Sequence, residues 1–262
     1  MKIMTELTID IKPSGIESGI VYAPFDKGLA VLQENGLELI SLPQNAQLRM
    51  QQGKDSYVSK NGNWTREGVI YIPNSTPKLV RNSPILQSAK GATDAHRNDK
   101  EFYIAQEQLE QSLTDSIDFP EENIEIPTKR FGSEALTVYA FGGEKQAQAY
   151  GKFLKDAGIS KMPVLVVDKN YVNEQTRPFA RQAWFRYLDY WSCLLGDCGL
   201  LLSGGSRVRG VRLVSGEASA QKISGTQNSE LYTIKNLKDA LNSIGITDGI
   251  ERTIFEALKR KN

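Results

Sequence analysis

The chain has 262 residues, of which 40% are hydrophobic and 24% charged, and its formal net charge is +1. This composition is typical of a globular protein and excludes a disordered chain. No apolar run approaches the roughly 20 residues that a membrane-spanning helix needs, and Met1–Ile11 does not resemble a signal peptide. We therefore expect a soluble, cytoplasmic protein with no membrane partner, in which Cys193 and Cys198 are free thiols.

Residues 1–90 are predicted to form a β-rich domain, either a small barrel or a sandwich. The apolar runs Gly28–Leu32 and Leu37–Leu42 flank Asn35-Gly36, a pair that is typical of a hairpin because both residue types tolerate positive φ. The same pair recurs at Asn61-Gly62. The sequence indicates no helix of useful length in this segment.

Residues 91–130 are predicted to be an acidic connector with one helix, Glu101–Ile117. Residues 93–126 carry 2 basic and 10 acidic side chains, a net charge of −8, whereas residues 127–262 have a net charge of +7. Two interpretations of this imbalance stay open. The basic half binds an anionic partner, or it is an ordinary solvated surface.

Residues 131–262 are predicted to form an α/β domain, so that the whole chain is α/β, or α+β overall. Leu136–Phe141 is expected to be a strand, Glu144–Ala157 a helix ended by Gly158, and Val164–Val167 a buried strand. Together they predict a βαβ unit of a parallel sheet.

The remainder is predicted to contain a long helix, two strands and a helical hairpin. The helix is indicated by a stripe of Ala180, Trp184, Tyr187, Leu188, Trp191 and Leu195. The strands Gly199–Leu202 and Val208–Val214 are joined by a Gly-Gly turn. A polar loop over 216–229 leads to the terminal hairpin of Ile234–Ile244 and Ile250–Lys259.

The residues that usually carry catalysis are scarce. His96 is the chain's single histidine, and we expect it to be a solvated side chain in the connector. Cys193 and Cys198, with one distant histidine, do not supply a zinc site. The sequence therefore assigns no metal, no cofactor and no catalytic residue, and whether the protein is an enzyme stays open.

One candidate site lies at the carboxyl edge of the predicted βαβ unit. Gly142 and Gly143 stand between the expected strand and helix, Lys145 follows them, and Asp168 ends the next strand. A glycine turn at a helix N-terminus can hold a phosphate, which predicts a site for a nucleotide or phosphate ligand. The alternative is a plain structural turn.

A second candidate site is formed by arginines among aromatic residues. Arginine side chains suit phosphate contacts, and aromatic rings can stack on bases. These arginines are Arg177, Arg181, Arg207, Arg209 and Arg212, and alternation places Arg207 and Arg209 on one face of a strand. The alternative is that the aromatic residues are core.

Three functions follow from these sites. The first is a nucleic-acid-binding protein that uses the basic C-terminal domain. The second is an enzyme or sensor for a nucleotide or phosphate ligand, and the third is a non-enzymatic assembly or interaction protein. The sequence does not predict an oligomeric state.

Overall fold

The structure is a computed structural model that describes residues 8–10, 16–186, 193–195 and 202–213. The chain divides into two compact units, Met1–Val214 and Ser215–Asn262, and every described residue belongs to the first. The predicted loop over 216–229, the predicted terminal hairpin and Cys198 lie outside the described residues.

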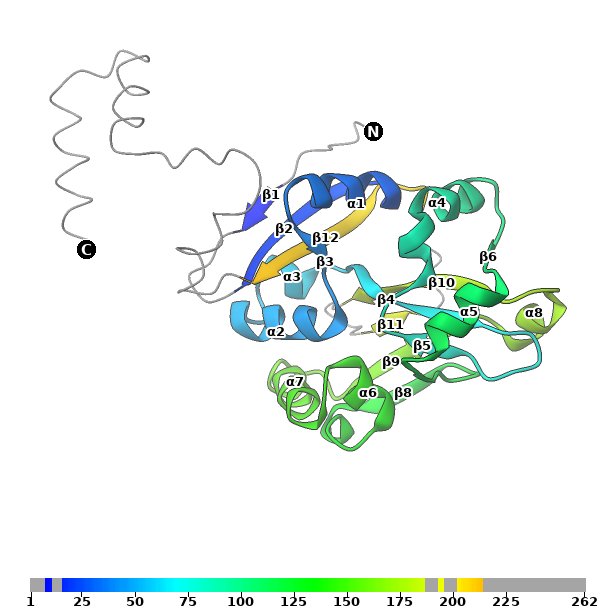
Figure 1. Ribbon diagram of the computed structural model, residues 1–262. Coiled ribbons are helices and arrows are strands. Elements are labelled where there is room, and N and C mark those ends of the chain that lie inside the picture. The colour runs from blue at the N-terminus through cyan, green and yellow to red at the C-terminus, as the bar shows by residue number, and fades with distance from the viewer. Residues whose placement is uncertain (1–7, 11–15, 187–192, 196–201, 214–262) are drawn as a thin grey trace, which may run out of the picture. The chain divides into compact units, whose positions relative to one another are not determined.

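Helices and strands are mixed along the chain (Figure 1). The α-helices are α1 (Phe25–Glu34), α2 (Leu42–Gln52), α3 (Tyr57–Lys60), α4 (Ala89–Arg97), α5 (Gln106–Leu113), α6 (Ala135–Ala140), α7 (Glu144–Asp156) and α8 (Lys169–Glu174). The strands are β1 (Thr8–Asp10), β2 (Ile16–Ala23), β3 (Glu38–Leu39), β4 (Asn63–Tyr71), β5 (Lys78–Val80), β6 (Phe102–Tyr103), β7 (Ser116–Asp118), β8 (Ile124–Pro127), β9 (Lys161–Leu165), β10 (Phe179–Arg186), β11 (Cys193–Leu195) and β12 (Ser206–Leu213). Two 3₁₀ turns are η1 (Pro84–Ser88) and η2 (Thr128–Arg130).

The strands form one mixed sheet. Its main path runs β1-β2-β12-β4-β10-β11-β9-β8, and β3, β5, β6 and β7 pair beside this path. β12 pairs antiparallel with β2 from Ser206↔Ala23 to Leu213↔Ile16, and it meets β4 in parallel at Val208↔Trp64. The last strand of the described residues, β12, therefore lies between strands from the first third of the chain.

The described residues are α+β overall, as predicted, but the predicted boundaries near residues 90 and 130 are not confirmed. β2 and β4 come from segment 1–90 and lie in the same sheet as β10 and β12, which come from segment 131–262. The contact between Ser18 and Arg209 joins residues 191 positions apart. Local sequence patterns do not encode such a pairing, which is why the segments looked separate.

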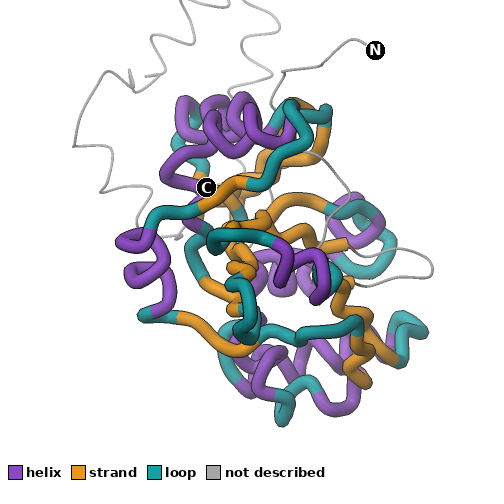
Figure 2. Tube along the Cα trace, turned by 90° about the vertical axis from the view of Figure 1, so that its right-hand side faces the viewer, coloured by secondary structure: helices purple, strands orange, loops and turns teal. Residues whose placement is uncertain are grey.

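Helices lie on both sides of the strands (Figure 2). On one side, Trp184 and Val208 belong to the same buried cluster as Leu32 of α1. On the other side, Phe185 contacts Tyr150 of α7, with ring centroids 6.0 Å apart. Two hydrophobic layers thus enclose β10, and both faces of this strand are buried.

One predicted N-terminal strand is wrong, and a second is confirmed only over two residues. Gly28–Leu32 lies inside α1, and Leu37–Leu42 spans β3 and the first residue of α2. Asn35 caps the C-terminus of α1, and Gly36 follows at φ +66°. A helix C-terminus and a tight hairpin both favour Asn-Gly because both use positive φ, so this pair does not distinguish them.

The predicted long helix is also wrong, because its first half is β10. Ala180 and Trp184 share a helical spacing, but residues four apart also lie on the same face of a strand, and both belong to one buried cluster. A strand buried on both faces shows a continuous apolar run instead of alternation. Residues 187–192 lie outside the described residues.

The predicted βαβ unit is wrong at its first strand. Leu136–Phe141 falls largely on α6, because Leu136 and Ala140, four residues apart, are both buried. Helix α7 and the strand that follows are confirmed near their predicted positions, and Gly158 ends the helix at φ +91°. The expected helix Glu101–Ile117 is confirmed only over α5, with β6 and β7 on either side.

Candidate functional site

The residues of the predicted phosphate site are not brought together. Gly142 and Gly143 join α6 to α7, and their N–H groups donate to the carbonyls of Tyr139 (3.3 Å) and Val138 (2.8 Å). Lys145 is exposed on α7, whereas the Asp168 carboxylate caps α8 by accepting from two of its N–H groups. Figure 1 shows α7 and α8 at opposite sides of the described unit. The two glycines therefore serve a turn between helices.

The five predicted arginines do not share one surface either. Arg177 precedes β10 and Arg181 lies near its start, next to the Tyr71 end of β4, whereas β12 meets β4 at Trp64. Seven residues of strand separate these two positions on β4, a distance on the order of 20 Å. Arg212 donates to Glu17 at 2.7 and 2.8 Å, and Arg181 pairs with Glu101.

Arg207 takes part in a different arrangement with Tyr22 and Tyr57, which we name the tyrosine–arginine surface. Arg207 and Tyr22 are direct partners across β12 and β2, and the guanidinium carbon lies 4.9 Å from the centroid of the Tyr22 ring. Nε of Arg207 donates to the hydroxyl of Tyr57 at 3.2 Å. Three elements far apart in the sequence thus converge on one guanidinium group.

The short helix α3 lies beside β12 (Figure 1) and carries Tyr57, whose hydroxyl accepts from Arg207 of that strand. The helix begins because the Ser56 hydroxyl accepts from the N–H of Ser59, and Val58 is buried in the cluster that also contains Val211 of β12. Tyr57 points away from that cluster and is 48% exposed, the highest value among the large hydrophobic side chains of the described residues.

Beneath this surface lies Arg209, which is 3% exposed. Its Nη1 donates to the Ser18 hydroxyl at 3.1 Å, and its guanidinium carbon lies 5.9 Å from the centroid of the Tyr57 ring. Arg207 and Arg209 thus both contact Tyr57, as alternation along the strand predicts. Burial raises the pKa of Tyr22, while the nearby charge of Arg207 opposes that rise.

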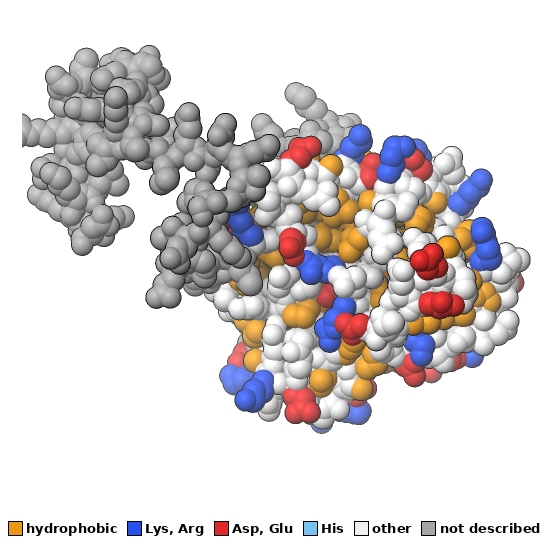
Figure 3. Space-filling view, in the orientation of Figure 1, with side chains coloured by type: hydrophobic (Ala, Val, Ile, Leu, Met, Phe, Trp, Pro, Cys, Tyr) orange, Lys and Arg blue, Asp and Glu red, His pale blue; other side chains and the backbone are white. Residues whose placement is uncertain are grey.

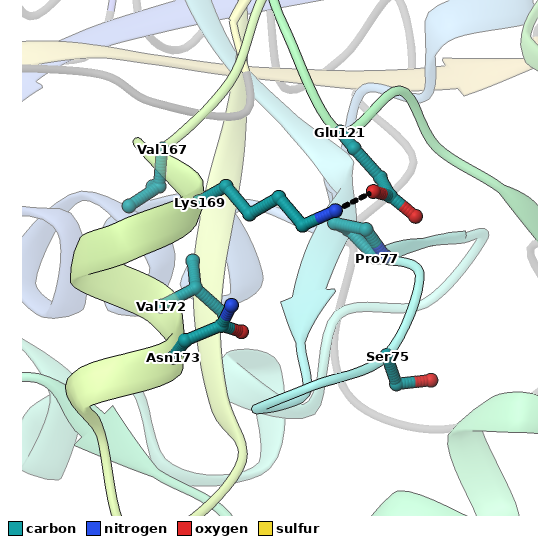
Figure 4. A pocket seen from close by; sticks show the side chains of 7 residues that line it. All are labelled: Ser75, Pro77, Glu121, Val167, Lys169, Val172 and Asn173. Carbon is teal, nitrogen blue, oxygen red and sulfur yellow. Dashed lines mark hydrogen bonds and ion pairs between the residues drawn. The ribbon is translucent and has the colours of Figure 1, made fainter.

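A small pocket lies between the β4–β5 loop and α8 (Figure 4). Lys169 reaches across it to Glu121, with Nζ 2.5 Å from Oε2, and Glu121 also accepts from the Thr76 hydroxyl at 2.9 Å. The pocket has room for about one water molecule. Its two charged residues, Lys169 and Glu121, are paired with each other.

His96 belongs to a buried network, so its predicted solvated position is wrong. It lies on α4 and is 5% exposed, because Ala92, Thr93 and His96 form the inward face of that helix. Arg181 and Glu101 act on its charge from nearby, and burial is the main cause that lowers its pKa.

Glu101 also holds an exposed tyrosine. The hydroxyl of Tyr171 donates to Glu101 at 2.8 Å, and the ring is 40% exposed. Burial and then this hydrogen bond raise the pKa of Tyr171 to about 12. The phenol therefore keeps its proton at physiological pH.

The acidic connector is largely neutralised by basic side chains of neighbouring elements. Five carboxylates of the connector pair with cations on β5, β9, β10 and α8 or, for Arg81, directly after β5. These pairs are Arg81–Asp115, Lys78–Asp118, Lys169–Glu121, Lys161–Glu125 and Arg181–Glu101. Figure 3 shows acidic and basic side chains interspersed over the face that it presents. Within the ranges that the structure describes, no cluster of three or more potential metal ligands and no helix able to cross a membrane occurs.

No protein-family model and no curated protein matches the sequence. One solved structure, described as "Accommodation of massive sequence variation in Nanoarchaeota by the C-type lectin fold", matches with a TM-score of 0.55 and 14% sequence identity. The match covers 78% of this chain and 100% of that chain. The likeness is one of fold. At this identity it shows the C-type lectin fold and no shared activity.

Sequence reasoning missed Tyr22 and Tyr57. Tyr22 stands in an apolar run that reads as core, and Tyr57 follows Ser56 in a polar stretch predicted as part of a hairpin. Neither position carries a local signal of function. The pairing of β2 with β12, between residues 185 positions apart, brings Tyr22 to Arg207, and the packing of α3 brings Tyr57 to it.

Proposed function

We propose that this protein is a recognition protein that binds a protein partner through the tyrosine–arginine surface. One observation carries the proposal. The guanidinium of Arg207 is held by the Tyr22 ring and the Tyr57 hydroxyl, yet no carboxylate of the described residues lies within ion-pair distance of it. Tyrosine and arginine are the residue types that, with tryptophan, contribute most to protein–protein binding energies.

The composition of the surface supports this proposal. A tyrosine offers a large amphipathic contact area with only two rotatable side-chain bonds, so little conformational entropy is lost when a partner covers it. Tyr57 is fixed at its base by α3 and is about half exposed. Such a rigid, exposed aromatic side chain is typical of binding surfaces.

The fold supports the proposal in a second way. The solved structure with the same fold is described as accommodating massive sequence variation. A scaffold with this property keeps its core while its surface side chains change, which suits recognition of different partners. In this chain Val208 points into the core, and its neighbour Arg207 points to the opposite face of β12.

The experiment is affinity capture with the full chain, followed by purification of the identified partner and titration calorimetry. Arg207→Ala and Tyr57→Ser are the test variants. Arg177→Ala is the matched control, because Arg177 also stacks on a tyrosine, 4.6 Å from the Tyr103 ring. We expect binding to be lost in the test variants and kept in the control. A partner that binds all four proteins equally, or no retained partner, contradicts the proposal.

Nucleic-acid binding is a second candidate function. Arg207 and Arg209 face the same side, and two tyrosines beside them could stack on bases. Fluorescence anisotropy with single- and double-stranded DNA and RNA, at low and near-physiological salt, tests it. Binding that weakens steeply with salt and on charge reversal of both arginines supports it, and no binding at low salt contradicts it.

A further inference from the structure

We propose that the anchoring group of the partner is a carboxylate of an acidic side chain, which the terminal amino groups of Arg207 hold in two hydrogen bonds. This inference rests on the proposed function and names the chemistry of its partner. The surface is therefore expected to prefer a protein segment that carries Asp or Glu beside an apolar residue.

The hydrogen bonds of Arg207 leave the required donors available. Nε is committed to the Tyr57 hydroxyl, whereas Nη1 and Nη2 make no hydrogen bond to any residue that the structure describes. Nη1 and Nη2 are not buried polar atoms left without a partner. Since they make no hydrogen bond to a described residue, both groups are in contact with solvent. The terminal edge of a guanidinium group matches the spacing of the two oxygens of a carboxylate.

A second arginine of β12, Arg212, is already paired with a carboxylate of the same chain. Arg212 faces Glu17 across β12 and β2, and its Nε and Nη2 donate to the two carboxylate oxygens at 2.7 and 2.8 Å. At Arg207 the corresponding position on β2 holds Tyr22, which offers a ring. Arg212 thus has a carboxylate partner within the described residues, whereas the carboxylate for Arg207 is expected to come from the binding partner.

The tyrosines also prepare Arg207 for binding. An arginine side chain normally loses much rotational freedom when it is fixed by a partner. Here the Tyr22 ring and the Tyr57 hydroxyl already restrict the guanidinium in the free protein. Apolar atoms of Tyr57 beside the incoming group would exclude water and strengthen the ion pair.

A carboxylate fits this surface better than a nucleic-acid backbone does. Backbone binding draws on several cations that each meet a phosphate. Arg209 is buried against Ser18, and Arg212 is paired with Glu17. Next to Tyr57, Lys60 pairs with Asp55 at 3.2 Å. One available guanidinium between two rings therefore suits a single anionic group.

Selection from a phage library of random 12-residue peptides on the immobilised full chain tests the inference. Peptides are sorted by whether their binding is weakened, but still measurable, on Arg207→Gln and on Tyr57→Ser. We expect Asp or Glu to be enriched at one position among the dependent peptides. In a synthetic peptide of that sequence, replacing this residue by Gln or Asn should weaken binding to the wild type about tenfold.

The double-mutant cycle identifies the contact. On Arg207→Gln the same peptide change should have an effect below about twofold, whereas on Arg177→Gln it should stay near tenfold. Because the acid-to-amide change is made in the peptide, a folding defect of a variant cannot imitate it. Circular dichroism of each variant checks its fold.

The outcomes separate the two proposals. Peptides that depend on Tyr57 and Arg207 without enrichment of acidic residues overturn this inference and leave the proposed function standing. Competition by a short duplex DNA, with phosphate-like salt dependence, overturns it in favour of nucleic acid. A selection in which no peptide depends on these two residues overturns both.

Discussion

The backbone N–H of Leu202 donates a hydrogen bond to Nδ1 of His96, at 3.4 Å. The carbonyl of Leu202 accepts from the N–H of Phe25 at 2.8 Å, and its side chain is buried. Because Nδ1 accepts, the proton of the neutral ring lies on Nε2, which is buried without a hydrogen-bond partner among the described residues. The residue that leads into β12 is therefore held by neutral His96.

His96 should make stability fall at acidic pH. Burial lowers its pKa, Arg181 acts in the same direction, and Glu101 opposes them. The unfolded chain takes up the proton below about pH 6.5 while the folded state resists it, so the free energy of unfolding decreases as pH falls. His96→Asn removes the titration and should flatten this part of the profile. Urea unfolding at pH 5.5 and 7.5 measures it, and an unchanged slope in the variant contradicts the expectation.

Glu67 should have the opposite effect. It is 2% exposed on β4, and both carboxylate oxygens lie 3.0 Å from the N–H of Leu42. Burial raises its pKa from 4.5 to about 7, and that hydrogen bond only partly opposes the rise. The stability that the protonated form contributes is fully present below pH 4.5 and is lost as pH rises through 7.

The stability of Glu67→Gln relative to the wild type should therefore increase as pH rises. Between pH 4.5 and 8 the difference in free energy of unfolding should shift in favour of the variant by roughly 3 kcal/mol. The comparison is made in a His96→Asn background, so that the histidine does not contribute. A difference that stays constant with pH would show that Glu67 is already ionised in the folded protein.

Local sequence patterns correctly predicted elements that are specified by residues within a single turn or helix. The helix α7 and its terminal Gly158 were predicted because spacing and positive φ are local properties. The strand β10 was missed because hydrophobic clusters bury both of its faces and remove the alternation that marks a strand. Helix α6 was missed because the burial of Leu136 and Ala140 outweighs the strand preference of Val138 and Tyr139.

The candidate site was predictable only in part. Alternation placed Arg207 and Arg209 on one face, and both contact Tyr57. Their partners were not predictable, because the register of β2 against β12 decides that Arg207 meets Tyr22 and Arg212 meets Glu17. A shift of one residue would exchange the two faces.

Gly151 is expected to resist substitution although it lies inside a helix. A Cβ at this position of α7 would lie 2.3 Å from the carbonyl oxygen of Thr128 and 2.9 Å from Cβ of Phe131. Replacing Gly by Ala in an exposed helix stabilises by about 1 kcal/mol, but here η2 has to move. We expect Gly151→Ala to destabilise the protein by roughly 2 kcal/mol in urea unfolding.

Gly91→Ala in α4 is the control for this substitution. There the nearest atom to a new Cβ is the hydroxyl of Ser88, at 2.6 Å, which can rotate away. This variant should be neutral or slightly stabilised. Equal stability of the two variants would show that η2 adjusts without cost.

Replacing Arg207 should mainly weaken peptide binding, whereas replacing Arg212 should mainly lower the free energy of unfolding. Arg212→Ala leaves the buried carboxylate of Glu17 without its guanidinium partner, and we expect a loss of about 2 kcal/mol, since the arginine itself is half exposed. Arg207→Ala removes one contact to the Tyr22 ring and one to an exposed hydroxyl, and should cost less than about 1 kcal/mol. Affinity for the selected acidic peptide should change in the reverse order. Urea unfolding and calorimetry on both variants give the comparison. If Arg207→Ala proved as destabilising as Arg212→Ala and left peptide affinity unchanged, the role of Arg207 would be structural.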